Sequence, residues 1–284
     1  MLSIIISSYL PRYFAALEKS IAETCGLQYE IIKIDNPGLM GICKAYNLGA
    51  ENAKYENLLF IHEDVIFLTK NWGEKLIAHI AKKNTGIIGI AGSSYVPHAP
   101  SSWTVTKKHN FINILQGNKN NSEASRQNTT LADRNKVFAV DGVFLALKKE
   151  NFLSFKFNED LKGFHGYDLD ISLRISKKFQ NYVINDILIQ HFSSGNLNQL
   201  WFDTNVKIRQ ALGASFNTEF DSEIEKNSFL GFLSGYFKYY PVSKKSILFT
   251  LNFYPYRKIK FIDHFIILKK YYHYFKYASD INKN

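Results

Sequence analysis

The sequence predicts an α/β fold with a mostly parallel central sheet flanked by helices, followed by a helical tail. Short apolar runs alternate with segments of helical spacing, and several of these runs end directly at ionisable residues. Such alternation is typical of βαβ units. Towards the C-terminus, aromatic and basic residues interleave instead. We therefore expect two parts, an α/β domain over residues 1–215 and a helical, basic and aromatic-rich extension over residues 216–284.

The first strands end in polar residues. Residues 2–8 form an apolar run rich in β-branched side chains, which is typical of a buried parallel strand. Further strands are expected over 29–34 and 58–61, with helices over 13–24 and 42–53. Ligands of open α/β sheets bind outside the carboxyl ends of the strands. Ser8, Asp35 and Asp64 are therefore expected at one sheet edge.

The rest of the domain is less regular. A helix is expected over 72–80 and a strand over 86–91. Residues 93–135 are dense in Ser, Asn, Thr and Lys, which predicts a long substrate-facing loop or a disordered segment. Regular structure is expected again over 137–147, over a turn and helix within 163–178, and over a last strand at 182–190 that leads into His191.

The composition limits the class of protein. A chain of 284 residues, 46% of them hydrophobic, can bury one substantial core. Two cysteines, Cys25 and Cys43, cannot form the disulfide framework of a small secreted fold, which favours a reducing cytoplasm. There is neither a run of about 18 apolar residues, as a spanning helix needs, nor a signal-peptide pattern at the N-terminus. We therefore expect a soluble or peripheral protein. Its content of Asn, Lys and Ile suggests a bacterial origin.

Ionisable residues at the predicted strand ends indicate chemistry. Asp64 and His191 combine a carboxylate and an imidazole, which suits a divalent cation such as Mn²⁺ or Mg²⁺. Asp168 is a candidate general base, although an acidic residue in a first helical turn also complements the helix dipole. Asp35 is either a hydrogen-bond acceptor for a nucleotide or a turn residue, and His191 is either a metal ligand or a structural hydrogen-bonding residue.

Two segments resemble the GT-A-fold (Rossmann-like) glycosyltransferases of the family 2 type, over about residues 1–195. In the stretch 41–64, Asn47-Leu48-Gly49 matches an Asn-x-Gly element, and His62-Glu63-Asp64 occupies the place of the Asp-x-Asp motif, as in a branch with His-x-Asp. In 166–170, Gly166-Tyr167-Asp168-Leu169-Asp170 is similar to the Gly-Glu-Asp-x-Asp helix start. Tyr167 replaces the glutamate, whereas Asp168 keeps the place of the general base of inverting members.

The resemblance implies a metal-dependent transfer of a sugar from a nucleotide-diphospho-sugar, with UDP favoured, to a carbohydrate hydroxyl. It also implies inversion at the anomeric carbon and a role in surface polysaccharide or lipooligosaccharide synthesis. The expected donor contacts are Ser8, Tyr9, Asp35, Asn47, His62 and Glu63. The expected sugar or acceptor contacts are Asp141, Gly142, His165, Gly166, Tyr167 and Trp103. For His165 and Tyr167 the alternative is a packed turn, and for Trp103 it is core packing.

The tail is strongly basic. Residues 231–284 contain sixteen Phe or Tyr residues and ten basic against two acidic residues, a net charge of +8. The segment 261–277 suits the interface of an anionic membrane on the cytoplasmic face, where lipid-linked glycan acceptors would lie. Packing on the catalytic domain or on a second subunit is the alternative. Nucleic acid is not expected, because no recognisable nucleic-acid module accompanies the basic residues.

Two other functions are alternatives to sugar transfer. The replacements at His62 and Tyr167 would suit a non-catalytic nucleotide- or carbohydrate-binding scaffold, whereas the retention of Asp64, Asp168 and His191 favours the enzyme. A nucleotidyltransferase would need a glycine-rich, basic phosphate-binding loop near the N-terminus. Residues 7–11 are not such a loop.

Overall fold

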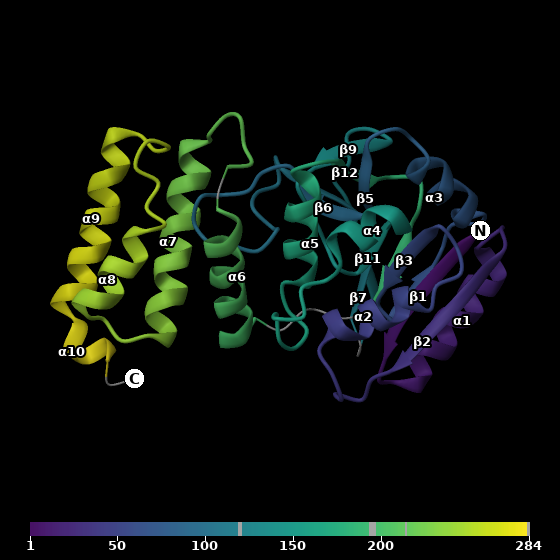
Figure 1. Cartoon of the computed structure of the whole chain (residues 1–284). Helices are drawn as coiled ribbons and strands as arrows, with labels where there is room; N and C mark the ends of the chain where they lie inside the picture. The colour runs from purple at the N-terminus through teal and green to yellow at the C-terminus, as the bar shows by residue number, and fades with distance from the viewer. Residues whose placement is uncertain (119–120, 193–196, 214, 283–284) are drawn as a thin grey trace. The chain divides into compact units, whose positions relative to one another are not determined.

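The computed structural model describes residues 1–118, 121–192, 197–213 and 215–282. The chain divides into two compact units (Figure 1). The α/β unit comprises Met1–Ser94 and Lys107–Asn196, and the helical unit comprises Tyr95–Thr106 and Leu197–Asn284. This division differs from the expected one at residue 215. The reason is that helix α6 (Gln199–Leu212) contributes Phe202 and Val206 to the core of the helical unit.

The central sheet of the α/β unit has seven strands in the order β2-β1-β3-β11-β5-β12-β9. The pairings make five strands run in one direction, while β11 and β9 run in the other, so a mostly parallel sheet is confirmed. The pairing of β1 with β2 sets Ser8 opposite Asp35 at the carboxyl ends of both strands. The strands are β1 (Leu2–Ser8), β2 (Tyr29–Asp35), β3 (Asn57–Ile61), β5 (Thr85–Gly89), β9 (Arg134–Val137), β11 (Phe144–Lys148) and β12 (Gln180–Ile184).

A second sheet corrects the prediction of a long loop over 93–135. It comprises β4 (Val65–Phe67), β6 (Ala91–Ser93), β7 (Asn110–Asn118), β10 (Ala139–Val140) and β13 (Ile189–His191), with β8 (Asn121–Asn128) paired to β7. Polar side chains are tolerated in these strands because they find partners. Asn113, which is fully buried, donates to the Ile187 carbonyl oxygen and accepts from Arg126. The predicted strand over 182–190 is also divided, with β12 in one sheet and β13 in the other.

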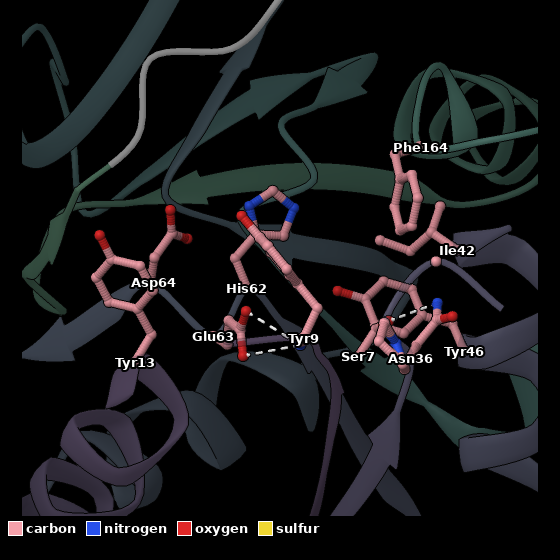
Figure 2. Close-up of a pocket in the computed structure, with 12 residues that line it drawn as sticks. Ser7, Tyr9, Tyr13, Asn36, Ile42, Tyr46, His62, Glu63, Asp64 and Phe164 are labelled. Carbon is pink, nitrogen blue, oxygen red and sulfur yellow. Dashed lines mark hydrogen bonds between the residues drawn. The ribbon is translucent and has the colours of Figure 1, made fainter. Parts of the chain in front are cut away.

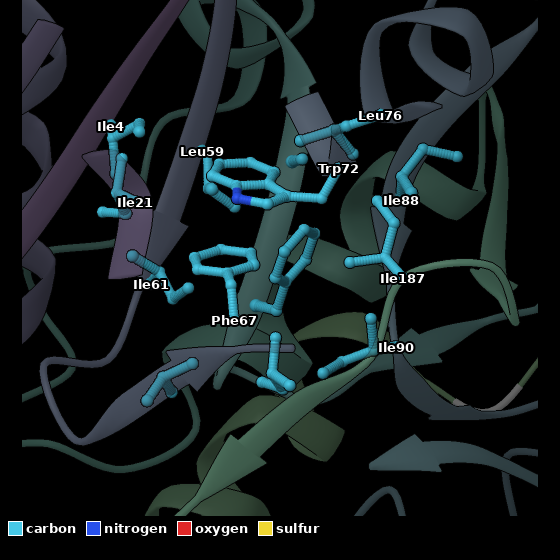
Figure 3. Packing of buried hydrophobic residues seen from close by; sticks show 14 of the residues in the cluster. Ile4, Ile21, Leu59, Ile61, Phe67, Trp72, Leu76, Ile88, Ile90 and Ile187 are labelled. Carbon is cyan, nitrogen blue, oxygen red and sulfur yellow. The ribbon is translucent and has the colours of Figure 1, made fainter. Parts of the chain in front are cut away.

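Helices cover the central sheet on both faces, so its inner strands, such as β1 and β3, are buried on both sides. Alternate residues of β1 and β3, among them Ile4 and Leu59, pack in one core with α1 and α3 (Figure 3). In this core the Trp72 indole stacks on the Phe67 ring, with centroids 3.9 Å apart. On the other face Phe60 packs against Tyr46 of α2. The helices are α1 (Pro11–Thr24), α2 (Ile42–Glu51), α3 (Trp72–Ile80), α4 (Lys149–Phe155) and α5 (Tyr167–Ser176).

The helical unit has a core rich in aromatic side chains. Phe229 and Phe232 of α7 pack with Phe202, Tyr254 and Tyr271. The helices after α6 are α7 (Ser222–Tyr239), α8 (Lys244–Leu251), α9 (Phe261–Lys276) and α10 (Ala278–Ile281), drawn in green to yellow in Figure 1. A helical tail is therefore confirmed. Within the described ranges, no helix combines the length and the apolar character needed to cross a membrane.

Candidate active site

A pocket of about 550 Å³ opens at the carboxyl ends of β1, β2 and β3 (Figure 2). The position follows from the parallel pairing, which brings the residues that follow these strands to one edge. The lining residues are Ser7, Tyr9, Tyr13, Asn36, Pro37, Gly38, Ile42, Tyr46, His62, Glu63, Asp64 and Phe164. Of the donor contacts expected from the sequence, Tyr9, His62 and Glu63 are in this lining.

Glu63 fixes the wall of the pocket that follows β1. Its buried carboxylate accepts hydrogen bonds from the Ser8 hydroxyl at 2.7 Å and from the backbone N–H groups of Tyr9 and Leu10. Ser8 is itself buried, and its hydroxyl donates its hydrogen bond to Glu63. Tyr9, by contrast, is exposed and extends along the pocket (Figure 2). Glu63 thus orders the start of the β1–α1 connection, and both of its oxygens are already engaged.

Three side chains at this edge form a possible metal site. Ligand atoms of His62, Asp64 and His191 all lie within 4.8 Å of one another. The pairing of β13 with β4 places His191 opposite Val65, and Phe192 N–H donates to the Asp64 carbonyl oxygen. His191 Nε2 is 3.5 Å from Asp64 Oδ1. Residues far apart in the sequence therefore meet because β13 returns beside the strand that follows Asp64.

His62 is held by Tyr167. The Tyr167 hydroxyl donates to the Gly142 carbonyl oxygen at 3.0 Å and lies 2.7 Å from His62 Nε2. A hydroxyl has one proton and a carbonyl can only accept, so His62 Nε2 is the donor to Tyr167 in this arrangement. That leaves Nδ1 unprotonated. Burial lowers the pKa of His62, against the opposing effect of Asp64, and this favours a neutral imidazole that can ligate a metal.

Gly142 joins Tyr167 to the candidate base. Its N–H donates to Asp168 Oδ2 at 3.0 Å, while its carbonyl oxygen accepts from Tyr167. A side chain at position 142 would overlap the Tyr167 hydroxyl, which explains the glycine. Burial, and next the charge of Asp141, raise the pKa of Asp168 to about 7, against the lowering effect of backbone N–H groups. Asp168 can therefore exchange a proton near neutral pH.

Other residues expected at the site lie elsewhere in the structure. Asp35 is 77% exposed and pairs with Lys33 at 2.6 Å, outside the pocket lining. Asn47 is buried, and its amide bridges the backbone of Phe157 and the Glu159 carboxylate. Both side chains therefore have structural partners. Their expected donor contacts remain untested.

The residues expected to contact the sugar or the acceptor are divided between the two units. Asp141 accepts from the Val143 N–H. Gly166, with φ +72°, immediately precedes α5, and burial lowers the pKa of the neighbouring His165. Trp103 belongs to the helical unit.

Sequence reasoning missed several lining residues. The turn Asn36-Pro37-Gly38 follows Asp35 directly, and Asn36 holds it by hydrogen bonds to Ser7 and to both backbone groups of Met40. The signal was present, because a strand followed by Asn-Pro-Gly predicts a turn at the sheet edge. Tyr13, Tyr46 and Phe164 carried no such signal, since aromatic residues at helical spacing or in a turn usually belong to a core.

Comparison with known proteins identifies the family. A profile of the "Glycosyltransferase like family" matches residues 4–215, which is most of the chain. The chain belongs to this glycosyltransferase family. Among curated proteins there is no match.

Solved structures share the fold of this chain. S. aureus TarS 1–349 in complex with UDP-GlcNAc gives a TM-score of 0.54 at 13% identity, covering 90% of this chain and 82% of the TarS chain. GalNAc-T7 with UDP, GalNAc and Mn²⁺ gives 0.54 at 12% identity, covering 87% of this chain and 53% of that chain. The chain thus spans about half the length of GalNAc-T7. At such identities the likeness shows the fold, and the GT-A fold is confirmed.

Proposed function

We propose that this chain transfers a sugar from a nucleotide-diphospho-sugar, with UDP favoured, to a hydroxyl of a carbohydrate acceptor. The observation that carries the proposal is the cluster of His62, Asp64 and His191 at the pocket on the carboxyl ends of β1 to β3. The family supports it, as does the fold shared with TarS bound to UDP-GlcNAc and with GalNAc-T7 bound to UDP and Mn²⁺. Ligands of open α/β sheets bind at this edge.

The ligand set suits a divalent cation. Two imidazoles and one carboxylate would hold it through His62, Asp64 and His191. Mg²⁺ prefers oxygen ligands, so two imidazoles among three ligands favour a first-row transition-metal ion over Mg²⁺, and we propose Mn²⁺. A cation bound there would neutralise charge on the diphosphate leaving group. Tyr167 would orient His62, since its hydroxyl accepts a hydrogen bond from Nε2–H and thereby leaves Nδ1 available to a metal.

Asp168 is the proposed general base. Its carboxylate would accept the proton of the acceptor hydroxyl as that oxygen attacks the anomeric carbon, in a single displacement with inversion. A pKa of about 7 keeps a substantial ionised fraction at neutral pH while making the carboxylate a stronger base than an ordinary aspartate. The Gly142 N–H fixes one of its oxygens. Asp168 is not in the pocket lining, so an acceptor would reach it from beside the donor pocket.

Calorimetric titration of UDP with and without Mn²⁺ tests the donor site. Wild-type protein is expected to bind UDP in a Mn²⁺-dependent way, and Asp64→Ala is expected to lose that dependence. The control is Asp133→Ala, which removes an exposed carboxylate from the same unit. Equal binding of UDP with and without Mn²⁺ would contradict the proposed metal site. Absence of binding to any nucleotide would favour a non-catalytic scaffold. The transfer activity of the wild type with different sugar donors is then measured, and Asp168→Asn serves as the inactive control.

We further propose a glycan acceptor, free or lipid-linked as in surface polysaccharide or lipooligosaccharide synthesis, used at the cytoplasmic face of a membrane that α9 contacts. The inner face of α9, with Ile267, Tyr271 and Tyr274, is buried. Five apolar residues of the opposite face are between 55% and 78% exposed: Phe261, Phe265, Leu268, Tyr272 and Phe275. Lys269 and Lys276 lie on that face by helical spacing, and the single acid of the helix, Asp263, is buried. An apolar face with lysines and no exposed acid complements an anionic lipid surface.

A further inference from the structure

The helical unit contains a second pocket, unrelated to the donor site. Its volume is about 360 Å³, and its walls come from the segment Tyr95–Thr106, the end of α6 and the residues that follow α8. The lining residues are His98, Arg209, Gln210, Gly213, Asn252 and Phe253. There is no carboxylate among them, although a buried carboxylate lies close behind.

That carboxylate belongs to Glu225 and is already satisfied. Glu225 is fully buried on α7, where one oxygen accepts from the Tyr95 hydroxyl at 2.8 Å and the other from the His98 N–H at 2.9 Å. The negative charge of Glu225 raises the pKa of Arg209, against the lowering effect of burial. Within the described residues, however, Glu225 and Arg209 form no ion pair within 4.0 Å. Glu225 therefore compensates charge at a distance and does not occupy the guanidinium.

Arg209 offers unused donors to the pocket. It is only 4% exposed, yet it lines the pocket. Burial lowers its pKa to about 10, so it remains charged at neutral pH. A guanidinium has five N–H donors. In the described part of the chain, its hydrogen bond is the one from Nη1 to the Gly213 carbonyl oxygen at 3.2 Å. A nearly buried cation that lines a pocket and has donors left for a ligand is suited to an anionic group.

His98 adds a neutral donor. Lys258 Nζ lies 3.1 Å from His98 Nδ1, and because an ammonium group can only donate, Nδ1 is the acceptor. Burial, with Lys258 and Arg209 adding to it, lowers the pKa of His98 to about 4, so the ring is neutral at pH 7. Its proton must then sit on Nε2. The pocket thus combines a guanidinium fork with an imidazole N–H donor, while Lys258 donates to the other nitrogen of the ring.

We propose that this pocket binds a phosphate group. Arginine pairs with phosphate through two parallel hydrogen bonds, which matches the free donors of Arg209. The pocket is larger than a bare phosphate, and the side-chain amides of Gln210 and Asn252 suit the hydroxyls of an attached sugar. The shared chemistry is a phosphate dianion, supplied either as free phosphate or as the phosphate of a phosphorylated glycan.

Titration calorimetry on the chain of 284 residues in metal-free buffer tests the site. The probes are inorganic phosphate, glucose 6-phosphate and glucose, all at one ionic strength. Glucose 6-phosphate is expected to bind, and Arg209→Gln is expected to weaken its binding at least tenfold. Lys207→Gln, which removes the same charge from the exposed side of α6, should leave the affinity unchanged. Tighter binding of glucose 6-phosphate than of phosphate indicates a phosphorylated glycan, and equal affinities indicate the free ion.

Three results would overturn the proposal. The first is that neither inorganic phosphate nor glucose 6-phosphate binds to the wild-type protein. The second is that a folded Arg209→Gln variant binds them as tightly as the wild type does. The third is that Lys207→Gln loses as much affinity as Arg209→Gln. A measurement on wild-type protein covers the case in which Arg209→Gln does not fold. The NMR signal of His98 Nε2–H should shift on addition of glucose 6-phosphate, and an unchanged signal at saturation would also overturn the site. Mn²⁺-dependent UDP binding should persist in Arg209→Gln, so this proposal and the transferase proposal fail separately.

Discussion

Asp168 owes its raised pKa first to burial and second to the nearby Asp141. Asp141→Asn removes the second cause while leaving an amide oxygen to accept from the Val143 N–H. A general base must be ionised, so kcat/KM should rise with pH through an apparent pKa near 7 in the wild type. In Asp141→Asn this rise should occur at lower pH. Asp133→Asn, an exposed acid, serves as the control, and an unchanged pH profile in Asp141→Asn would count against Asp168 as the base.

Tyr167 allows a second test at the level of one hydroxyl. Tyr167→Phe keeps the ring, whose centroid lies 5.7 Å from that of Tyr46 and 5.8 Å from that of Phe157. It removes the hydroxyl that accepts the hydrogen bond from His62 Nε2–H. Loss of such an outer partner usually weakens metal binding by about 10–100-fold. Mn²⁺ affinity, measured by calorimetry or by the electron paramagnetic resonance signal of free Mn²⁺, should fall by that factor. Tyr29→Phe is the control, and an unchanged affinity in a folded Tyr167→Phe would contradict the positioning role.

At the scale of elements, Glu63 joins the end of β3 to the start of α1. Glu63→Gln replaces one accepting oxygen by an NH₂ group that would face backbone donors at Tyr9 and Leu10. Because hydrogen bonds to buried charged groups contribute about 1.5–3 kcal/mol, we expect a loss of unfolding free energy on that order. Urea denaturation measures it. Glu51→Gln, on the exposed side of α2, should have little effect. Equal stability of Glu63→Gln and wild type would mean that Glu63 does not hold this connection.

The elements show where sequence reasoning succeeds. The strands β1, β2 and β3 were predicted within a residue or two. For β1 and β3 the reason is that buried parallel strands are continuous apolar runs. The strands β7 and β8 were missed, because polar residues such as Asn113 gain their partners only from distant segments. For the same reason the residues near 182–190 alone did not predict that this segment is divided into β12 and β13, which pair in different sheets.

The candidate site divides in the same way. His62 and Asp64 follow one strand, so their proximity could be predicted, and the ordered motif also indicated His191. The hydrogen bond from His62 to Tyr167 could not be predicted, because it depends on how α5 begins beside Gly142. Asn47 shows the reverse case. The position matched a motif, but its amide connects α2 to the Phe157 backbone, a contact that only the fold reveals.

At the scale of the whole molecule, the distribution of charge and apolar surface predicts behaviour at membranes. The protein is expected to sediment with vesicles that contain anionic lipid and not with neutral ones. Phe265→Ser with Phe275→Ser should abolish this binding. Lys269→Gln with Lys276→Gln should weaken it by about 1 kcal/mol per lysine. Leu131→Ser, which removes an exposed leucine from the α/β unit, is the control. Self-association without lipid preference would instead assign the face to a second copy of the chain.

The carboxyl group proposed to accept the proton also has a consequence for folding. A group whose pKa is about 7 in the folded chain, against 3.8 ordinarily, prefers the protonated form when folded. As pH rises from about 4 to 7 the unfolded chain releases this proton more readily, so Asp168 progressively lowers the stability of the fold. Asp168→Asn should therefore melt at a higher temperature than wild type at pH 8 and at nearly the same temperature at pH 4. A difference independent of pH would contradict the raised pKa. The contribution of Asp168 to the stability of the fold would then be least favourable under the alkaline conditions in which this base is fully ionised.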